Sequence, residues 1–216
     1  MHRWICICAL LAGACLSTTA RADFTFDDIQ YWIGTGANEA AFVVDWNDGI
    51  NPQSLAWGYR WNGTATGQDM LTAIVTTDSD LYAKISESGG FGVALFGMGY
   101  DLDHDGFAIS DGTVFTNGLA ITGPADEAYS LDPADHYQEG WMSAGFWSYW
   151  LSDDGVNWGF SGTGMSGRTL TDGAWDGWSW APAFNATAPS EPVPAVPEPM
   201  TAVLFGLGML LAARRR

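Results

Sequence analysis

The sequence has few basic residues, and most of them lie near its ends. Of its 8 Lys and Arg residues, two lie within the first 22 residues and three are the last three residues. Residues 23–195 keep only Arg60, Lys84 and Arg168 against 24 carboxylates, a net charge of −21. Binding to nucleic acid or to an anionic membrane surface depends on Lys and Arg, so this charge argues against both kinds of partner.

Cysteine is also scarce, and Cys6, Cys8 and Cys15 all lie within a predicted secretory signal peptide. Residues 1–22 have a basic start, an apolar run and small residues before a cleavage site. Cleavage by signal peptidase after residue 22 leaves an exported chain without thiols, which excludes disulfides, cysteine-ligated zinc and cysteine nucleophiles. Lipidation at Cys15 is a weaker alternative, because the apolar run before it is short.

The C-terminal end carries a pattern of three parts. A Val-Pro-Glu-Pro motif precedes an apolar run over residues 200–213, and three arginines end the chain. The motif and the arginines are Val196, Pro197, Glu198, Pro199, Arg214, Arg215 and Arg216. As a helix the run spans only about 21 Å of a ~30 Å hydrocarbon core, so we expect a transient anchor. The arginines keep this end in the cytoplasm and the body of the chain outside.

This order of motif, apolar helix and arginines resembles the PEP-CTERM sorting domain. The resemblance implies export in a Gram-negative bacterium, transient anchoring in the inner membrane, processing by an exosortase-type protease, and release to the cell surface or into extracellular polysaccharide. A simple C-terminal anchor is the alternative. The predicted organisation is a signal peptide (1–22), an extracellular domain (23–185), a proline-rich linker (186–196) and a sorting segment with a short transmembrane helix (197–216).

The extracellular domain is predicted to be rich in strands. Aromatic and β-branched runs predict strands at residues 29–33, 40–46, 55–61, 92–100, 145–151, 157–161 and 177–180. Thr66 and Asp69 form an N-cap pattern before an apolar helical repeat, and a short second helix is expected over residues 80–85. Strands, one or two short helices and further strands predict a single antiparallel domain of the mainly β or α+β class.

One acidic loop predicts a calcium site. Asp101, Asp103 and Asp105 stand at alternating positions before a glycine, as in calcium-binding loops. The carbonyl of Phe107 would add a ligand, and Asp111 would replace the glutamate that usually completes such loops. Three close carboxylates are costly without a cation, which favours Ca²⁺ over the alternative of a bare acidic turn.

Aromatic residues gather between positions 141 and 180. The strand period places Trp147 and Tyr149 on one face, and Trp178 and Trp180 likewise share a face. Exposed rows of this kind stack on sugar rings or planar ligands, so these four residues are candidate ligand-binding residues. The alternatives are that they form the core or line the mouth of a pocket.

Several short motifs also resemble the transcobalamin C-terminal-like domains of bacterial surface proteins. They lie at residues 66–71, 90–92, 146–150 and 172–178. The resemblance implies a small α+β domain and, in some members, corrinoid binding. The insert that contains Asp101 departs from that family.

These observations predict an exported, exosortase-sorted surface or matrix protein with a non-catalytic acidic domain stabilised by Ca²⁺. The alternatives are a surface protein that binds a corrinoid or a glycan and, third, an enzyme acting on glycans. No catalytic residue is predicted. His104 and His136 lack the spacing of a zinc motif and are expected in solvated loops.

Overall fold

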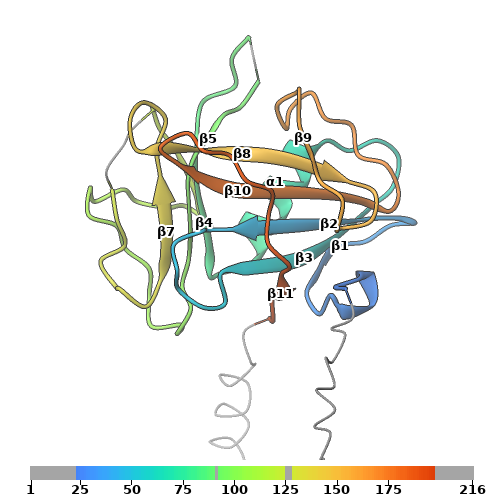
Figure 1. Cartoon of the computed structure of the whole chain (residues 1–216), viewed down its shortest axis with the longest axis horizontal. Coiled ribbons are helices and arrows are strands. Elements are labelled where there is room, and N and C mark those ends of the chain that lie inside the picture. The colour runs from blue at the N-terminus through green and yellow to red at the C-terminus, as the bar shows by residue number, and fades with distance from the viewer. Residues whose placement is uncertain (1–22, 91, 125–127, 198–216) are drawn as a thin grey trace, which may run out of the picture.

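Two mixed β-sheets and one α-helix form the part of the chain that the computed structural model describes, residues 23–90, 92–124 and 128–197. The larger sheet has the strand order β1-β3-β2-β10-β8-β9, with β11 also paired to β3 (Figure 1). Its strands are β1 (Trp32–Gly34), β2 (Asn38–Asp45), β3 (Ser54–Trp61), β8 (Gly145–Ser152), β9 (Gly159–Phe160), β10 (Ala174–Pro182) and β11 (Val193–Pro194).

The smaller sheet has the order β6-β4-β5-β7. It consists of β4 (Leu81–Ile85), β5 (Leu95–Tyr100), β6 (Leu119–Ile121) and β7 (His136–Glu139). A 3₁₀-helix (Phe26–Asp28) precedes the first strand, and α1 (Gly67–Thr77) connects the two sheets. The predicted β-rich α+β class is therefore confirmed. The prediction of purely antiparallel pairing was too simple, because β2 and β10 are parallel, and so are β1 and β3.

The helix α1 begins where the sequence predicts. The Thr66 hydroxyl accepts the backbone N–H of Asp69, and the Asp69 carboxylate accepts the backbone N–H of Thr66, which forms a capping box. The predicted second helix over residues 80–85 is wrong, because this segment is β4. Leu81, Ala83 and Ile85 follow the strand period, and all three are buried.

The two sheets and α1 enclose one core that contains aromatic residues from both sheets. Its fully buried members include Phe42 and Trp57 of the larger sheet, Met98 of the smaller one and Leu71 of the helix. A second cluster around Trp175 covers the opposite face of the larger sheet. Since both faces are covered, the central strands β2 and β10 are buried along nearly their whole length.

Indole N–H groups join the sheets across this core. Trp46, which follows β2, donates to the carbonyl of Met98 in β5 over 3.0 Å. Trp147 in β8 donates to the carbonyl of Gln138 in β7 over 3.1 Å. Each bond satisfies a buried polar atom while the indole ring fills the space between the sheets.

The predicted proline-rich linker is extended, but it packs on the domain. Its strand β11 pairs with β3, and Ala195, only 1% exposed, donates its N–H to the carbonyl of Ala56. The backbone N–H of Ser190 also bonds to the buried carboxylate of Asp45. The folded unit therefore extends past the predicted boundary at residue 185, because the sheet edge supplies partners for the linker backbone.

Within the described ranges, no helix combines the length and the apolar character needed to cross a bilayer. The predicted apolar helix over residues 200–213 lies outside those ranges, as do the signal peptide, Glu198, Pro199 and the three terminal arginines.

The packing of the linker predicts different effects for two alanines. Ala195→Asp should lower the free energy of unfolding by about 2–4 kcal/mol, because it places a carboxylate in a buried site. Ala188→Asp, in an exposed position of the same segment, should change it by less than about 0.5 kcal/mol. Urea denaturation of the full chain measures both, and equal effects would show that the segment is not packed.

Candidate functional site

The predicted calcium loop brings carboxylates from two separate segments together. One ligand oxygen from each of Asp101, Asp103 and Asp135 lies within 4.8 Å of the other two. A second group of the same size joins Asp103, Asp105 and Asp132. Ca²⁺ binds oxygens at 2.3–2.6 Å, so two ligands of one ion lie at most about 5 Å apart. Both groups meet that limit. Together they contain five carboxylates, which we call the acidic cluster: Asp101, Asp103, Asp105, Asp132 and Asp135.

Asp132 and Asp135 were missed by the sequence reasoning. They lie in the turn before β7, where the sequence reads Asp-Pro-Ala-Asp. In the antiparallel pair of β5 and β7, Tyr100 stands opposite His136, so the next residue after β5 and the last before β7 are neighbours. The acidic turn is visible in the sequence, but only this register connects it with Asp101.

Two of these carboxylates are buried with one oxygen each left without a hydrogen-bond partner. Asp101 accepts the N–H of Gly106 on Oδ2, and Asp135 accepts the N–H of Leu102 on Oδ1. The other oxygens, Oδ1 of Asp101 and Oδ2 of Asp135, are buried and unpartnered, although both side chains are at most 3% exposed. A buried carboxylate oxygen without a partner is costly, and a bound cation would satisfy both atoms.

The mutual repulsion of these groups is visible in their pKa values. Burial, together with the nearby carboxylates of Asp101 and Asp132, raises the pKa of Asp135 to about 6. The adjacent carboxylate of Asp103 is the main cause that raises the pKa of Asp105. Both shifts favour the protonated acid and show that the cluster resists full ionisation without a counter-charge.

Asp111 does not join the cluster, which corrects the predicted ligand set. Its carboxylate lies 2.7 Å from Nζ of Lys84 and also accepts the N–H of Thr113. Burial alone would raise the pKa of Asp111, but the hydrogen bonds from Lys84 and Thr113 lower it below its usual value. Lys84 is 1% exposed and also binds both carboxylate oxygens of Glu139, at 2.8 and 2.9 Å.

Phe107 has a packing role in the structure. Its ring stacks on Tyr82 with 4.3 Å between ring centroids and also lies close to Tyr137. This stacking fixes the end of the loop against β4 and β7. The use of its carbonyl as a calcium ligand stays a prediction.

The described basic side chains are all engaged away from the acidic cluster. Lys84 binds Glu139 and Asp111, Arg168 pairs with Asp176, and Arg60 pairs with Glu39. These three are the only Lys and Arg residues between positions 23 and 197. Neutralisation of the cluster is therefore left to protons or to a bound cation.

The four candidate aromatic residues are buried, as the core alternative predicts. Trp147, Tyr149, Trp178 and Trp180 are each between 4 and 6% exposed. Tyr149 stacks on Trp178 at 4.4 Å, and its hydroxyl donates to the buried carboxylate of Asp176. They do not form an exposed row.

Three of the four nevertheless line a pocket of about 420 Å³ between the two sheets. Trp147, Tyr149 and Trp178 form part of its wall, and Trp180 is not among the lining residues. The half-exposed rings of Trp141 and Phe160 stand at the same pocket. All of the described lining residues are uncharged, so the pocket suits a neutral group with apolar faces.

The polar ends of Trp147 and Tyr149 are bonded to residues that do not line the pocket. The indole N–H of Trp147 donates to Gln138, and the phenol of Tyr149 donates to Asp176. Burial and the adjacent Asp176 carboxylate raise the pKa of Tyr149, which keeps its phenol neutral. The pocket therefore offers ring faces rather than an activated hydroxyl.

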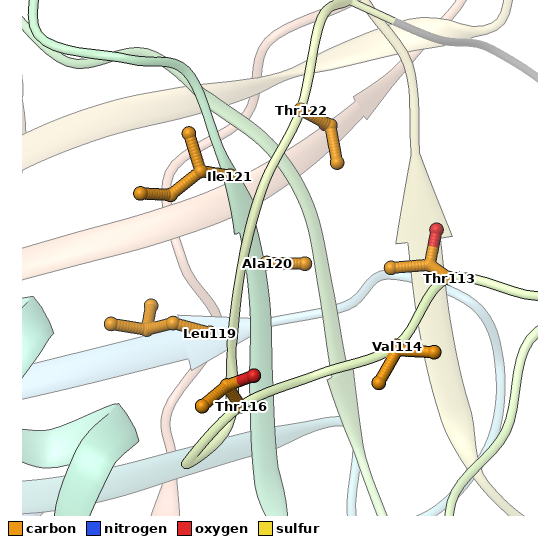
Figure 2. A pocket seen from close by; sticks show the side chains of 7 residues that line it. All are labelled: Thr113, Val114, Thr116, Leu119, Ala120, Ile121 and Thr122. Atoms are coloured by element: carbon orange, nitrogen blue, oxygen red, sulfur yellow. The ribbon is translucent and has the colours of Figure 1, made fainter.

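A surface groove of about 560 Å³ lies beside the edge strand β6. Figure 2 shows that two segments of the chain, which diverge from a tight turn, form this groove. Thr113 and Val114 lie on one segment, and Ala120 and Thr122 lie on the other. Val114 is 82% exposed, so the groove is a shallow surface feature.

His136 differs from the solvated loop residue that the sequence suggests. Its ring is buried and stacks on Trp46 at 4.4 Å. Its nitrogens face the Asp48 carboxylate at 2.9 Å and the Pro52 carbonyl at 3.0 Å. His104 is partly exposed and pairs with Asp80 over 2.8 Å. These contacts give both histidines partners within the fold.

Comparisons of the chain with family models, with curated proteins and with solved structures found no match.

Because Lys84 is buried against Glu139, its removal should strongly destabilise the fold. Lys84→Met should lower the free energy of unfolding by about 3–5 kcal/mol, because Glu139 would remain buried without its cation. Arg60→Met removes an exposed pair and should cost at most about 1 kcal/mol. Chemical denaturation of both variants measures the difference. Similar losses would mean that the Lys84–Glu139 pair is not a buried charge pair.

Proposed function

We propose that this protein is an exported, exosortase-sorted protein of the cell surface or extracellular matrix, with a non-catalytic acidic domain stabilised by Ca²⁺. The observation that carries the calcium part is the group of Asp101, Asp103 and Asp135, in which two buried carboxylate oxygens are unpartnered. Export and sorting rest on the sequence patterns at the two ends of the chain.

The charge of the domain supports this proposal. A protein with a net charge of −21 over residues 23–195 repels itself, and divalent cations are the counter-charges that hard carboxylate oxygens prefer. A domain without thiols also lacks disulfides, the usual cross-links of exported proteins. Metal ligation is a second way to cross-link a chain outside the cell, because it needs only carboxylates and a supply of cations.

Calcium should raise the melting temperature of the full chain, purified in a mild detergent. At a free Ca²⁺ concentration of 100 times the Kd, binding stabilises the folded state by about 2.7 kcal/mol. For a domain of this size that corresponds to about 5–10 °C, measured by differential scanning calorimetry with CaCl₂ and with EDTA.

Two variants make this test specific. Asp135→Asn keeps the Oδ1 acceptor for the N–H of Leu102 but should lose the response to calcium. Asp153→Asn neutralises an exposed carboxylate outside the cluster and should keep it. An unchanged melting temperature of the natural chain in CaCl₂ would refute stabilisation by calcium.

A second candidate function is the binding of a neutral ring, part of a corrinoid or a glycan, in the aromatic pocket. The observation that favours it is the uncharged cavity of about 420 Å³ walled by Trp147, Tyr149 and Trp178. This volume is typical of small-molecule sites, and aromatic ring faces suit planar ligands and the apolar faces of sugars.

Titration calorimetry with cobalamin and with soluble polysaccharides tests this function. Trp141→Ala removes a half-exposed ring at the pocket and should weaken binding at least about fivefold. Tyr129→Ala removes an exposed ring that does not line the pocket and should leave affinity unchanged. If no ligand of either class binds the natural chain, the receptor function is excluded for these ligands.

A further inference from the structure

A long excursion of the chain, residues 101–135, connects the neighbouring strands β5 and β7. The acidic cluster lies where the two ends of this excursion meet, which we call its neck. The chain runs from the end of β5, Tyr100, to the start of β7, His136, and between them it rejoins the smaller sheet at the short edge strand β6, which pairs with β4. Asp101 is the first residue of this excursion and Asp135 is the last. Leu102 and Asp135, 33 residues apart in the chain, are joined by a hydrogen bond of 3.0 Å.

The described part of the excursion has little packing of its own. Its strand β6 has three residues, and Ile109 and Ala120 are its buried apolar side chains. Val114, Ile121, Tyr129 and Leu131 are all more than 60% exposed. Two backbone bonds, from Ser110 to Tyr129 and from Leu131 to Ala108, join its outgoing and returning arms.

The pairing of β6 with β4 and the bond of Asp111 to Lys84 hold the middle of the excursion. Its other described stretches bury little apolar surface, so their order depends also on how the two ends are held. At the neck, however, the two ends present carboxylates to each other. Asp101 and Asp135 are buried there, and each has one oxygen without a hydrogen-bond partner. Without a cation this pair pushes the neck apart, and with one it draws the two arms together.

We propose that a divalent cation bound by Asp101, Asp103 and Asp135 closes the neck of this excursion and orders its described residues, 102–124 and 128–134. The inference rests on the calcium part of the proposed function and adds what the ion does. In a domain without thiols the ion takes the place of a disulfide across the neck, because either cross-link restricts the open states of the loop.

Hydrogen exchange of the full chain, followed by mass spectrometry in CaCl₂ and in EGTA, tests this inference. If opening of the excursion releases the ion, its amides should exchange on the order of 100-fold more slowly at a free Ca²⁺ concentration of 100 times the Kd. Peptides from residues 102–124 and 128–134 should show this change. Peptides from β2, β8 and β10 in the larger sheet should show much less.

Matched variants identify the ligands. Asp135→Asn and Asp103→Asn should each abolish the slowing by calcium, and Asp153→Asn should preserve it. Asp103 is exposed, so its variant keeps the test decisive if Asp135→Asn folds poorly. In EGTA the Asp135→Asn chain should exchange no faster than the natural chain, because the substitution relieves repulsion at the neck.

The outcomes separate this inference from the function on which it rests. Calcium binding in a calorimeter with equal slowing in all peptides would overturn the clamp and leave calcium stabilisation standing. No heat of binding and no change in exchange would overturn both. Slowing confined to the excursion, and lost in both ligand variants, would support the clamp.

Discussion

Buried carboxylates outnumber the basic side chains that can neutralise them, and much of the structure follows from this imbalance. Seven Asp and Glu residues are buried, whereas residues 23–197 contain three Lys and Arg residues. Neutral groups therefore donate hydrogen bonds to several of these buried carboxylates. Trp57 donates to Asp78 over 2.7 Å, Tyr137 donates to Glu139, and the backbone of Ser190 donates to Asp45. Aromatic residues therefore serve both as core volume and as hydrogen-bond donors.

At the neck of the excursion, the carboxylates have too few neutral donors. Asp101 and Asp135 each receive one backbone N–H, and each keeps a buried oxygen without a partner. Lys84, the only buried cation of the described chain, is committed to Glu139 and Asp111. A divalent cation from solution would supply the charge that the chain itself lacks. The shortage of Lys and Arg in the sequence thus favours a cation at the proposed calcium site.

Local patterns in the sequence predicted local structure well. The N-cap of α1 at Thr66 and most strands follow from neighbouring residues. The segment 80–85 shows the limit of such reasoning, because a short apolar run fits a helix or a strand until its neighbours are known. Here β5 and β6 pair with it on both sides, and these hydrogen bonds make it a strand.

By itself, the sequence determined the shortage of cations, the absence of thiols after residue 22 and the alternating carboxylates of Asp101, Asp103 and Asp105. Tertiary structure alone decided which other acids join them. The register of β5 and β7 brings Asp135 to Asp101, and burial of Lys84 removes Asp111 from the set. Tertiary packing also placed Trp147 and Tyr149 in the core and at a pocket wall. Each of these outcomes depends on contacts between segments far apart in the chain, and the alternation of residues along one strand carries no information about them.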